Sequence, residues 1–180
     1  MKIKKIILVI QRNLIKKLIF FNTDIYIRKY TNYLKKIGIK FNGESKSVKY
    51  IDPSAYFDGT DYSLISIGDN VTISREVMLL THDYSITTAL CSVGKFIKRH
   101  EGELFLKKEI KIGNNCFIGA RASILPGTEI GDNCIIGSGA IVKGVIPKGS
   151  VVIGNPCKII SKTENFAKKI LTENKYYVER

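Results

Sequence analysis

Residues 112–142 repeat a six-residue pattern, and this pattern constrains the fold more than any other feature of the chain. Every block begins with Ile or Val, at the six positions Ile112, Ile118, Ile124, Ile130, Ile136 and Val142. Four of these six residues are followed by Gly, and the fifth position of a block is small except at Ile146. The period fits neither an α-helix nor an ordinary strand. It is typical of a parallel β-helix, in which each block forms a short strand and a turn.

Three such blocks make one coil with three flat sides, so blocks three apart are expected to stack on adjacent coils. Cys116 and Cys134 stand three blocks apart in the sequence, as do Asn115 and Asn133. Each pair should therefore lie about 4.8 Å apart, the spacing of neighbouring strands. First-position side chains are expected to point inward and form the core. Glycine at the second position predicts a turn that needs positive φ or has no space for a Cβ atom.

A length of 180 residues with 44% hydrophobic residues indicates one domain with terminal arms. The four cysteines form no C-x-x-C pair, and Cys116 and Cys134 lie at inward positions. We therefore expect reduced thiols and a cytoplasmic location. The net charge of +13 is concentrated in residues 1–49, which hold 13 Lys or Arg against two acidic residues.

The basic segment 1–49 is predicted to be a helical N-terminal arm. Its first apolar run is too short for a signal peptide or a membrane span. On a helix, several apolar side chains share one face: Ile3, Ile7, Ile10, Leu14 and Phe21. Two interpretations remain open. The face packs against the β-helix or a neighbouring subunit, or residues 1–20 contact the inner membrane surface peripherally through anionic lipid.

Residues 24–36 are predicted to form a second helix, with Gly38 as its C-cap. Its apolar stripe consists of Tyr26, Tyr30, Tyr33, Leu34 and Ile37. Lysines interleaved with aromatic residues also suit a nucleic-acid surface. Tyrosine at helical spacing favours packing, so we expect no nucleic-acid partner.

The β-helix is predicted to span residues 50–160. Its first coils are imperfect: Ile51 and Ile67 are not separated by a whole number of blocks, so the register must slip once between them. The repeat breaks at His82, and residues 84–110 contain no clean hexad. Insertions in solenoids often carry the binding function. A final coil is expected to be closed by Pro156.

Residues 161–180 are predicted to form a C-terminal helix that covers the open end of the β-helix. Ser161 and Glu164 match a capping box, which marks the beginning of a helix.

His82 is the strongest candidate for chemistry because it lies where the ordered coils give way to the insertion. Histidine is the side chain best suited to proton transfer near neutral pH. Asp58 and Asp61 lie about one coil earlier and could reach the same rim, whereas Asp83 is adjacent and on a strand would face away. The chain has no H-x-x-x-H, P-loop or G-x-S-x-G motif, so we expect no metal.

The order of these features resembles the left-handed β-helix hexapeptide-repeat acyltransferases. The matching segments run from I-S-I-G-D-N to T-H-D, through the repeat of residues 110–142, to the closing G-N-P of residues 154–156. Within that family the chain is most similar to the maltose and galactoside acetyltransferases and to O-acetyltransferases of surface polysaccharides. The resemblance alone implies left-handed coils, since the crossover rule for parallel strands predicts right-handed ones.

The resemblance implies a homotrimer with three active sites between subunits, each using acetyl-CoA. It assigns His82 as the general base and the backbone N–H of Ala120 as the oxyanion donor. Phe117 would line the pantetheine tunnel, while Ser138, Lys143 and Lys158 fall at cofactor-binding positions. The acceptor-binding candidates are Asp58, Asp61 and Asp83. Maltose-type relatives have an Asn in the coil that here carries Asp58 and Asp61, and a Pro after the histidine, where this chain has Asp83.

We therefore expect an acetyl-CoA-dependent O-acetyltransferase acting on a sugar hydroxyl in surface-polysaccharide biosynthesis. Two alternatives use the same donor: N-acetylation of an amino-sugar nucleotide and O-acetylation of a drug of the chloramphenicol type. A third alternative is a non-catalytic β-helix scaffold.

Overall fold

The computed structural model describes residues 2–45, 47–59, 61–98 and 101–172. It begins with two helices, α1 (Lys2–Lys17) and α2 (Thr23–Ile37), joined by the short helix η1 (Leu18–Phe20). The Asn22 side chain caps α2 by accepting a 2.9 Å hydrogen bond from the Ile25 N–H. Gly38 ends α2 with a φ of +116°. The predicted second helix and its glycine C-cap are confirmed, and most of its apolar stripe is buried: Tyr26, Tyr30, Tyr33 and Leu34.

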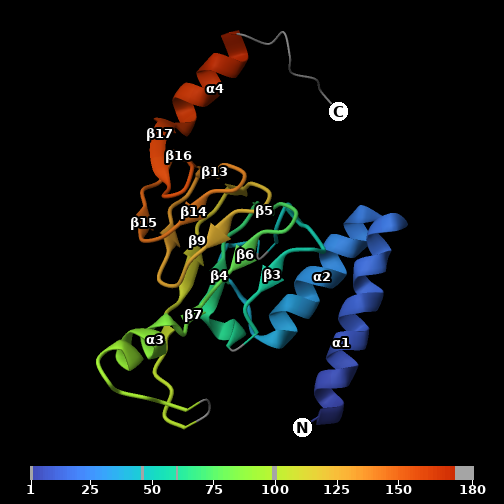
Figure 1. Cartoon of the computed structure of the whole chain (residues 1–180). Coiled ribbons are helices and arrows are strands. Elements are labelled where there is room, and N and C mark those ends of the chain that lie inside the picture. The colour runs from blue at the N-terminus through green and yellow to red at the C-terminus, as the bar shows by residue number, and fades with distance from the viewer. Residues whose placement is uncertain (1, 46, 60, 99–100, 173–180) are drawn as a thin grey trace.

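Three parallel sheets form the sides of a left-handed β-helix (Figure 1). The first contains β1 (Lys40–Phe41), β4 (Ile65–Ile67), β9 (Ile110–Ile112), β12 (Glu129–Ile130) and β15 (Val145–Ile146). The second contains β2 (Tyr50–Ile51), β5 (Thr72–Ile73), β10 (Phe117–Ile118), β13 (Ile135–Ile136), β16 (Ser150–Ile153) and the antiparallel β17 (Lys158–Lys162). The third contains β3 (Tyr56–Phe57), β6 (Met78–Leu79), β11 (Ser123–Ile124) and β14 (Ile141–Val142). Strand β1 lies within the range 1–49 that the sequence assigned to the arm.

The register of the repeat is the one that the sequence predicts. Phe117 pairs with Ile135 and Ser123 with Ile141, in each case the residue three blocks further along the chain. The exception at Ile146 has a structural reason. Ile146 pairs with Ile130, which lies less than three full blocks earlier, and is 5% exposed. The block that begins at Val142 is therefore shorter by two residues, and Ile146 occupies an inward first position instead of a fifth position.

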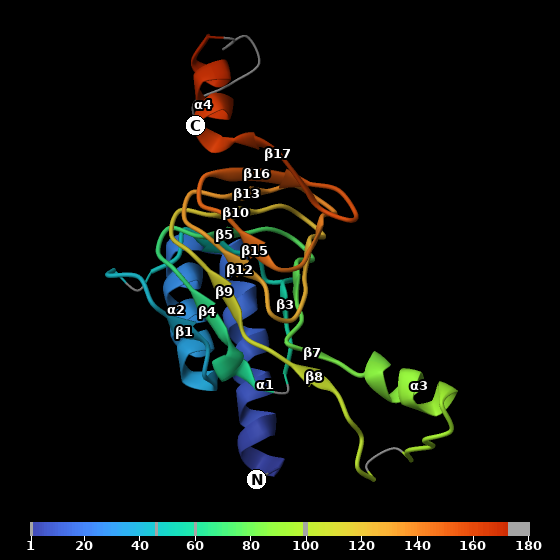
Figure 2. The same ribbon diagram turned by 90° about the vertical axis from the view of Figure 1, so that its left-hand side faces the viewer.

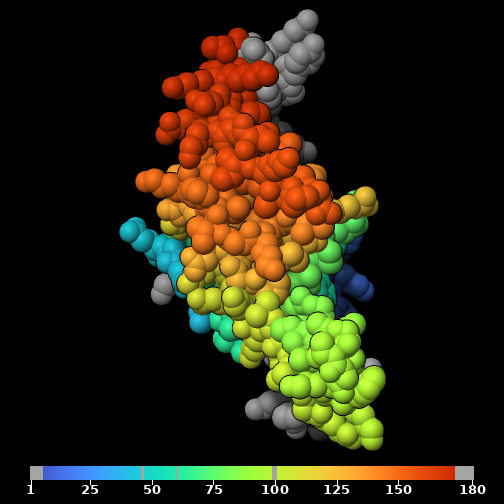
Figure 3. Space-filling model, turned by 60° about the vertical axis from the view of Figure 1, so that its left-hand side comes forward, coloured from blue at the N-terminus to red at the C-terminus, as the bar shows by residue number. Residues whose placement is uncertain are grey.

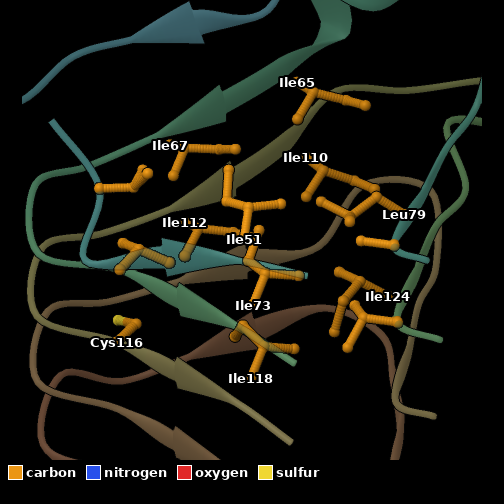
Figure 4. Close-up of a cluster of buried hydrophobic side chains, with 14 of the residues drawn as sticks. Ile51, Ile65, Ile67, Ile73, Leu79, Ile110, Ile112, Cys116, Ile118 and Ile124 are labelled. Carbon is orange, nitrogen blue, oxygen red and sulfur yellow. The ribbon is translucent and has the colours of Figure 1, made fainter. Parts of the chain in front are cut away.

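The core is a set of stacked aliphatic columns. In one of them, Ile51 pairs with Ile73, Ile73 with Ile118 and Ile118 with Ile136. Figure 4 shows Ile51, Ile73 and Ile118 of this column pointing into the coil. Truncating a buried Ile to Ala typically costs about 2–5 kcal/mol. The core is thus the main source of stability for strands only two residues long.

Second-position glycines are required for space, not for positive φ. A Cβ atom on Gly119 would lie 2.6 Å from the backbone nitrogen of Ser138 in the next coil. Positive φ falls two residues later, for example at Asn115 (53°) and Asn133 (58°). Asn115 donates a 2.7 Å side-chain hydrogen bond to Asn133. Asparagine therefore serves both as the turn residue and as a link between coils.

An insertion leaves the coils between β6 and β9. Its two ends form the antiparallel pair β7 (His82–Asp83) and β8 (Leu106–Lys107), and it carries the helix α3 (Ser85–Ser92). Figure 2 shows α3 projecting away from the coils, and Figure 3 shows the insertion at the opposite end of the surface from β17 and residues 163–172. The sequence predicted the insertion but not its helix.

The C-terminal helix α4 (Thr163–Thr172) begins two residues later than predicted, and residues 173–180 lie outside the described residues. Ser161 lies in β17, so it is not the N-cap that the capping box predicted. None of the described residues of α4 is buried. The strand β17, paired with β16, covers the last coil in its place.

The N-terminal helix packs through a different face from the one that the sequence pattern outlined. Ile15 of α1 is buried, and Leu8 of α1 together with Leu18 and Ile19 of η1 packs partly against the core. Ile7, Ile10 and Leu14 are each more than half exposed in the single chain. The Ile3 side chain lies outside the described ones. No helix among the described residues is long and apolar enough to cross a membrane.

Candidate active site

The site is built around His82, at the point where the chain leaves the third sheet for the insertion. β6 ends at Leu79, and β7 begins at His82, opposite Lys107 of β8. The Nδ1 atom of His82 contacts Oδ2 of Asp58, which directly follows β3 on the preceding coil. Stacking of coils thus brings together two residues that are 24 positions apart.

Asp58 is held as an ionised carboxylate. It is only 1% exposed, and its Oδ2 accepts hydrogen bonds of 2.9 Å from both the backbone N–H and the hydroxyl of Thr81. Burial alone would raise the pKa of Asp58, but the hydrogen bonds from Thr81 and His82 outweigh burial and lower it. A carboxylate can only accept, so the Nδ1 atom of His82 carries the proton and Nε2 is left as a base.

Two aromatic rings from the two ends of the insertion form a wall beside His82. The Tyr84 ring meets the imidazole edge-on, with 5.1 Å between the ring centres, and the centre of the Phe105 ring lies 6.4 Å from that of the imidazole. Tyr84 and Phe105 stack on each other at 4.7 Å. The His82 side chain remains 24% exposed. The sequence carries no signal for these contacts, because Tyr84 and Phe105 meet only when the insertion folds back, and Thr81 meets Asp58 only when the coils stack.

The other two acidic candidates lie at the rim of this site. Asp61 accepts a 2.9 Å hydrogen bond from Lys107 and a 2.6 Å bond from the Ser63 hydroxyl, and these bonds lower its pKa to about 2. Asp83 accepts a 2.8 Å hydrogen bond from the backbone of Ser85, which lowers its pKa. Both carboxylates are therefore ionised; Asp83 is exposed, and Asp61 is partly exposed.

The cofactor candidates occupy successive coils further along the β-helix. Phe117, on β10, is 44% exposed. Ala120 and Ser138 lie in stacked turns between the second and third sheets, where the Gly139 N–H donates to the Ala120 carbonyl at 2.8 Å. Lys143 lies in a turn between the third and first sheets, and Lys158 lies on β17. Ser138 and both lysines are exposed.

The Ala120 N–H, like the third-position N–H groups of Arg75 and Ser138 in the turns stacked on it, differs from those of two residues at the corner between the first and second sheets. At the same block position, the N–H of Asp69 bonds to the Asn114 side chain, and the N–H of Asn114 bonds to the Asp132 side chain. No hydrogen bond among the described residues uses the Ala120 N–H. This donor is thus available to an external oxygen atom.

The candidates fall on two different corners of the coil within one chain. His82, Asp83 and Lys143 lie where the third sheet passes into the first, and the Lys143 charge contributes to the lowered pKa of Asp83. Ala120 and Ser138 lie at the corner between the second and third sheets. The third sheet separates the two groups, so one chain does not bring the base and the oxyanion donor together.

Comparison with known proteins defines the family. Residues 109–144 match the family model described as bacterial transferase hexapeptide (six repeats). Protein CapG of Staphylococcus aureus is 35% identical over 147 residues, which are 82% of this chain and 78% of CapG. The chain belongs to the hexapeptide-repeat acetyltransferase family. Further relatives named "Putative acetyltransferase" match shorter stretches, and the alignments span about a third to a half of their length.

Solved structures of this family share the fold. A maltose O-acetyltransferase from Clostridium difficile 630 is 24% identical with a TM-score of 0.56, covering 87% of this chain and 88% of that one. A hexapeptide-repeat acetyltransferase from Vibrio cholerae O1 biovar eltor, complexed with acetyl coenzyme A, is 18% identical with a TM-score of 0.55, covering 86% of each chain. The predicted family and the left-handed β-helix are confirmed. Within the described residues, no group of three or more potential metal ligands occurs.

Proposed function

We propose that this family member is an acetyl-CoA-dependent O-acetyltransferase with His82 as the general base. The observation that carries the proposal is the contact between His82 Nδ1 and the buried Asp58 carboxylate. It sets the imidazole tautomer and leaves Nε2 as the basic atom, in a side chain that is 24% exposed. The carboxylate of Asp58 is buried, so we assign Asp58 the role of positioning His82 and not that of contacting the acceptor.

In the proposed reaction, the acceptor hydroxyl oxygen attacks the thioester carbonyl carbon while Nε2 of His82 takes the hydroxyl proton. The carbonyl oxygen becomes an oxyanion, which accepts a hydrogen bond from the Ala120 N–H. The tetrahedral intermediate then breaks its carbon–sulfur bond, and the CoA thiolate recovers the proton from His82. The products are the acetyl ester and free CoA. No further reactant is required.

The two corners imply that each site needs two chains. His82 of one subunit would meet the Ala120 turn of its neighbour, as in a homotrimer with three equivalent sites. Phe117 and Ser138 would border the donor on the Ala120 side. Lys143 and Lys158 are exposed cations suited to CoA phosphates.

The acceptor is proposed to be a sugar hydroxyl, in the biosynthesis of a surface polysaccharide. The name of the similar maltose O-acetyltransferase supports a sugar, and the solvent-accessible carboxylates of Asp61 and Asp83 are suited to hydrogen-bond sugar hydroxyls. The Tyr84 and Phe105 rings offer an apolar face for a pyranose ring. Amino-sugar nucleotides and drugs of the chloramphenicol type are competing acceptors. The His82–Asp58 pair argues against a purely structural scaffold.

An acceptor screen tests the function directly. The full chain is incubated with acetyl-CoA and single sugars, amino-sugar nucleotides or chloramphenicol, and free thiol release is followed. We expect release with a hydroxyl sugar and a loss of about 10²- to 10⁴-fold in His82→Ala. Thiol release at an unchanged rate in the His82→Ala variant would refute the assignment. Absence of any thermal shift with millimolar acetyl-CoA would favour the scaffold.

We also propose that residues 1–20 contact an anionic membrane surface from the cytoplasmic side. Ile6, Ile7, Ile10 and Leu14 form an exposed apolar strip on α1, in a segment whose charge is strongly positive. Apolar side chains combined with lysines are the composition of helices that lie in the interface of a bilayer. The phosphates of anionic lipids complement this charge.

A further inference from the structure

A second concave site lies between the N-terminal helices and the first coil, beside the segment that carries Asp58. Its cavity of about 260 Å³ is bounded by Arg12 and Lys16 of α1, by Tyr30 and Tyr33 of α2, and by Tyr56 and Tyr62 of the first coil. Figure 1 shows α1 and α2 side by side next to β3, at the opposite end of the coils from β16 and β17. None of the described residues that line this cavity is acidic.

Arg12 has an unsatisfied donor at this cavity. Its Nε atom is buried, and no acceptor among the described residues lies within hydrogen-bonding distance. A buried donor without an acceptor destabilises a folded chain, so such groups usually bind something. The Arg12 charge also reaches Tyr30 and Tyr33: burial raises the pKa of both phenols, and Arg12 opposes that rise.

Lys16 places a second positive charge one helical turn further along α1. Its Nζ lies 5.9 Å from the centre of the Tyr30 ring. Burial, and then the nearby charge of Arg12, lower the pKa of Lys16, and the Asp52 carboxylate outside the cavity offsets this only in part. Two like charges share a half-buried cavity whose described lining offers no carboxylate. An anion is the ligand that would relieve their repulsion and satisfy the Arg12 donor.

We propose that this cavity binds the phosphate group of the acetyl acceptor, which makes the acceptor a phosphate-bearing sugar; this inference rests on the proposed function. Guanidinium binds phosphate through two parallel hydrogen bonds, and lysine adds a point charge. The tyrosine rings provide surface for the rest of the ligand. Phe57 and Gly59 line the cavity and flank Asp58, so the segment that contacts the phosphate also carries the partner of His82.

Direct binding tests the site without requiring catalysis. Inorganic pyrophosphate is titrated into the full chain by calorimetry, at low and at high salt. We expect binding that weakens with salt, and a loss of about 10- to 100-fold in Arg12→Gln. Lys17→Gln is the matched control, since it removes one positive charge from an exposed position of the same helix. It should change the affinity less than about twofold. Arg12→Lys should restore part of the affinity.

The source of the phosphate is decided by two further ligands. Tighter binding of UDP-glucose than of pyrophosphate indicates a nucleotide-linked sugar, and tighter binding of geranyl diphosphate indicates a lipid-linked one. Each gain should disappear in Arg12→Gln. If that variant does not fold, as judged by its melting temperature, Lys16→Gln gives the same comparison.

Several results would overturn the inference: no binding of pyrophosphate, equal losses in Arg12→Gln and Lys17→Gln, or displacement of pyrophosphate by acetyl-CoA. These results leave the transfer reaction intact, because acetyl transfer to a neutral sugar would still proceed. Pyrophosphate binding with no transfer to any acceptor would instead count against the proposed function and against an acetyl acceptor as the bound molecule, while the anion site itself would stand.

Discussion

The Nδ1 atom of His82 faces the carboxylate of Asp58, although the two residues lie on different coils. Thr81, the neighbour of His82, anchors the same carboxylate oxygen with two hydrogen bonds. The Asp58 carboxylate is therefore held in place by Thr81, independently of the imidazole that it orients. This arrangement separates two roles: Asp58 holds the tautomer, and His82 moves the proton.

Asp58→Asn tests the positioning role. Asparagine keeps the size of the side chain but removes the negative charge that stabilises an imidazolium. We expect kcat to fall by about 10- to 100-fold with little change in the KM for acetyl-CoA. Steady-state kinetics with both substrates measure this split. A normal kcat would show that Asp58 only contributes to folding.

The same residue predicts a dependence of stability on pH. The folded-state pKa of Asp58 lies below its ordinary value of 3.8, so the carboxylate favours folding above that value. This contribution is complete above about pH 5 and is lost as pH falls through the folded-state pKa. The difference in unfolding free energy between wild type and Asp58→Asn should therefore shrink below about pH 4. Urea unfolding at a series of pH values measures it, and a constant difference would contradict the prediction.

Ala120→Pro tests the oxyanion donor by removing one N–H. Pro126 occupies the same third position in the following block, and Gly127 after it has positive φ, as Arg121 has after Ala120. Proline is favoured before such a residue in a turn, so the variant should fold. We expect kcat to fall about 10²- to 10³-fold. Retained activity would remove Ala120 from the mechanism.

Mixing two inactive variants tests whether the site is shared between chains. His82→Ala and Ala120→Pro subunits are unfolded together and reassembled in equal amounts. If each site takes His82 from one chain and Ala120 from its neighbour, about a quarter of the sites are intact. Recovery of that activity is expected, whereas sites contained in single chains would recover none.

The repeat predicted the coils because it reports contacts that recur along the chain. Pairing of Phe117 with Ile135 follows from spacing alone. The sequence also predicted that Gly119 serves either positive φ or a lack of space. The structure shows that the reason is space, because the backbone of the next coil leaves no room for a Cβ atom. The partner of His82 could not be deduced, since Asp58 and Asp61 were equally placed along the sequence and only folding turns Asp58 inward.

Glycine substitutions check this account of the turns. Gly119→Ala places a Cβ atom 2.6 Å from the Ser138 nitrogen, and we expect a loss of about 1–3 kcal/mol, as for an overpacked core. Gly139→Asn is the control, because asparagine already holds positive φ at Asn115 and Asn133 and no atom lies within 4 Å. Thermal and urea unfolding measure both variants. Equal losses would contradict a steric cause.

Helix α1 packs on the core through Leu8 and Ile15, so the apolar strip of Ile6, Ile7, Ile10 and Leu14 stays exposed in the single chain. Ile10→Glu introduces a negative charge into an apolar surface that is more than half exposed. It should reduce binding to phosphatidylglycerol vesicles by about tenfold, since it removes apolar contact and adds repulsion. Leu171→Glu, on the 81% exposed position of α4, is the matched control and should bind normally. Co-sedimentation measures the bound fraction at several salt concentrations. If Ile10→Glu binds vesicles normally but dissociates the trimer, the strip packs against a neighbouring subunit instead of a bilayer.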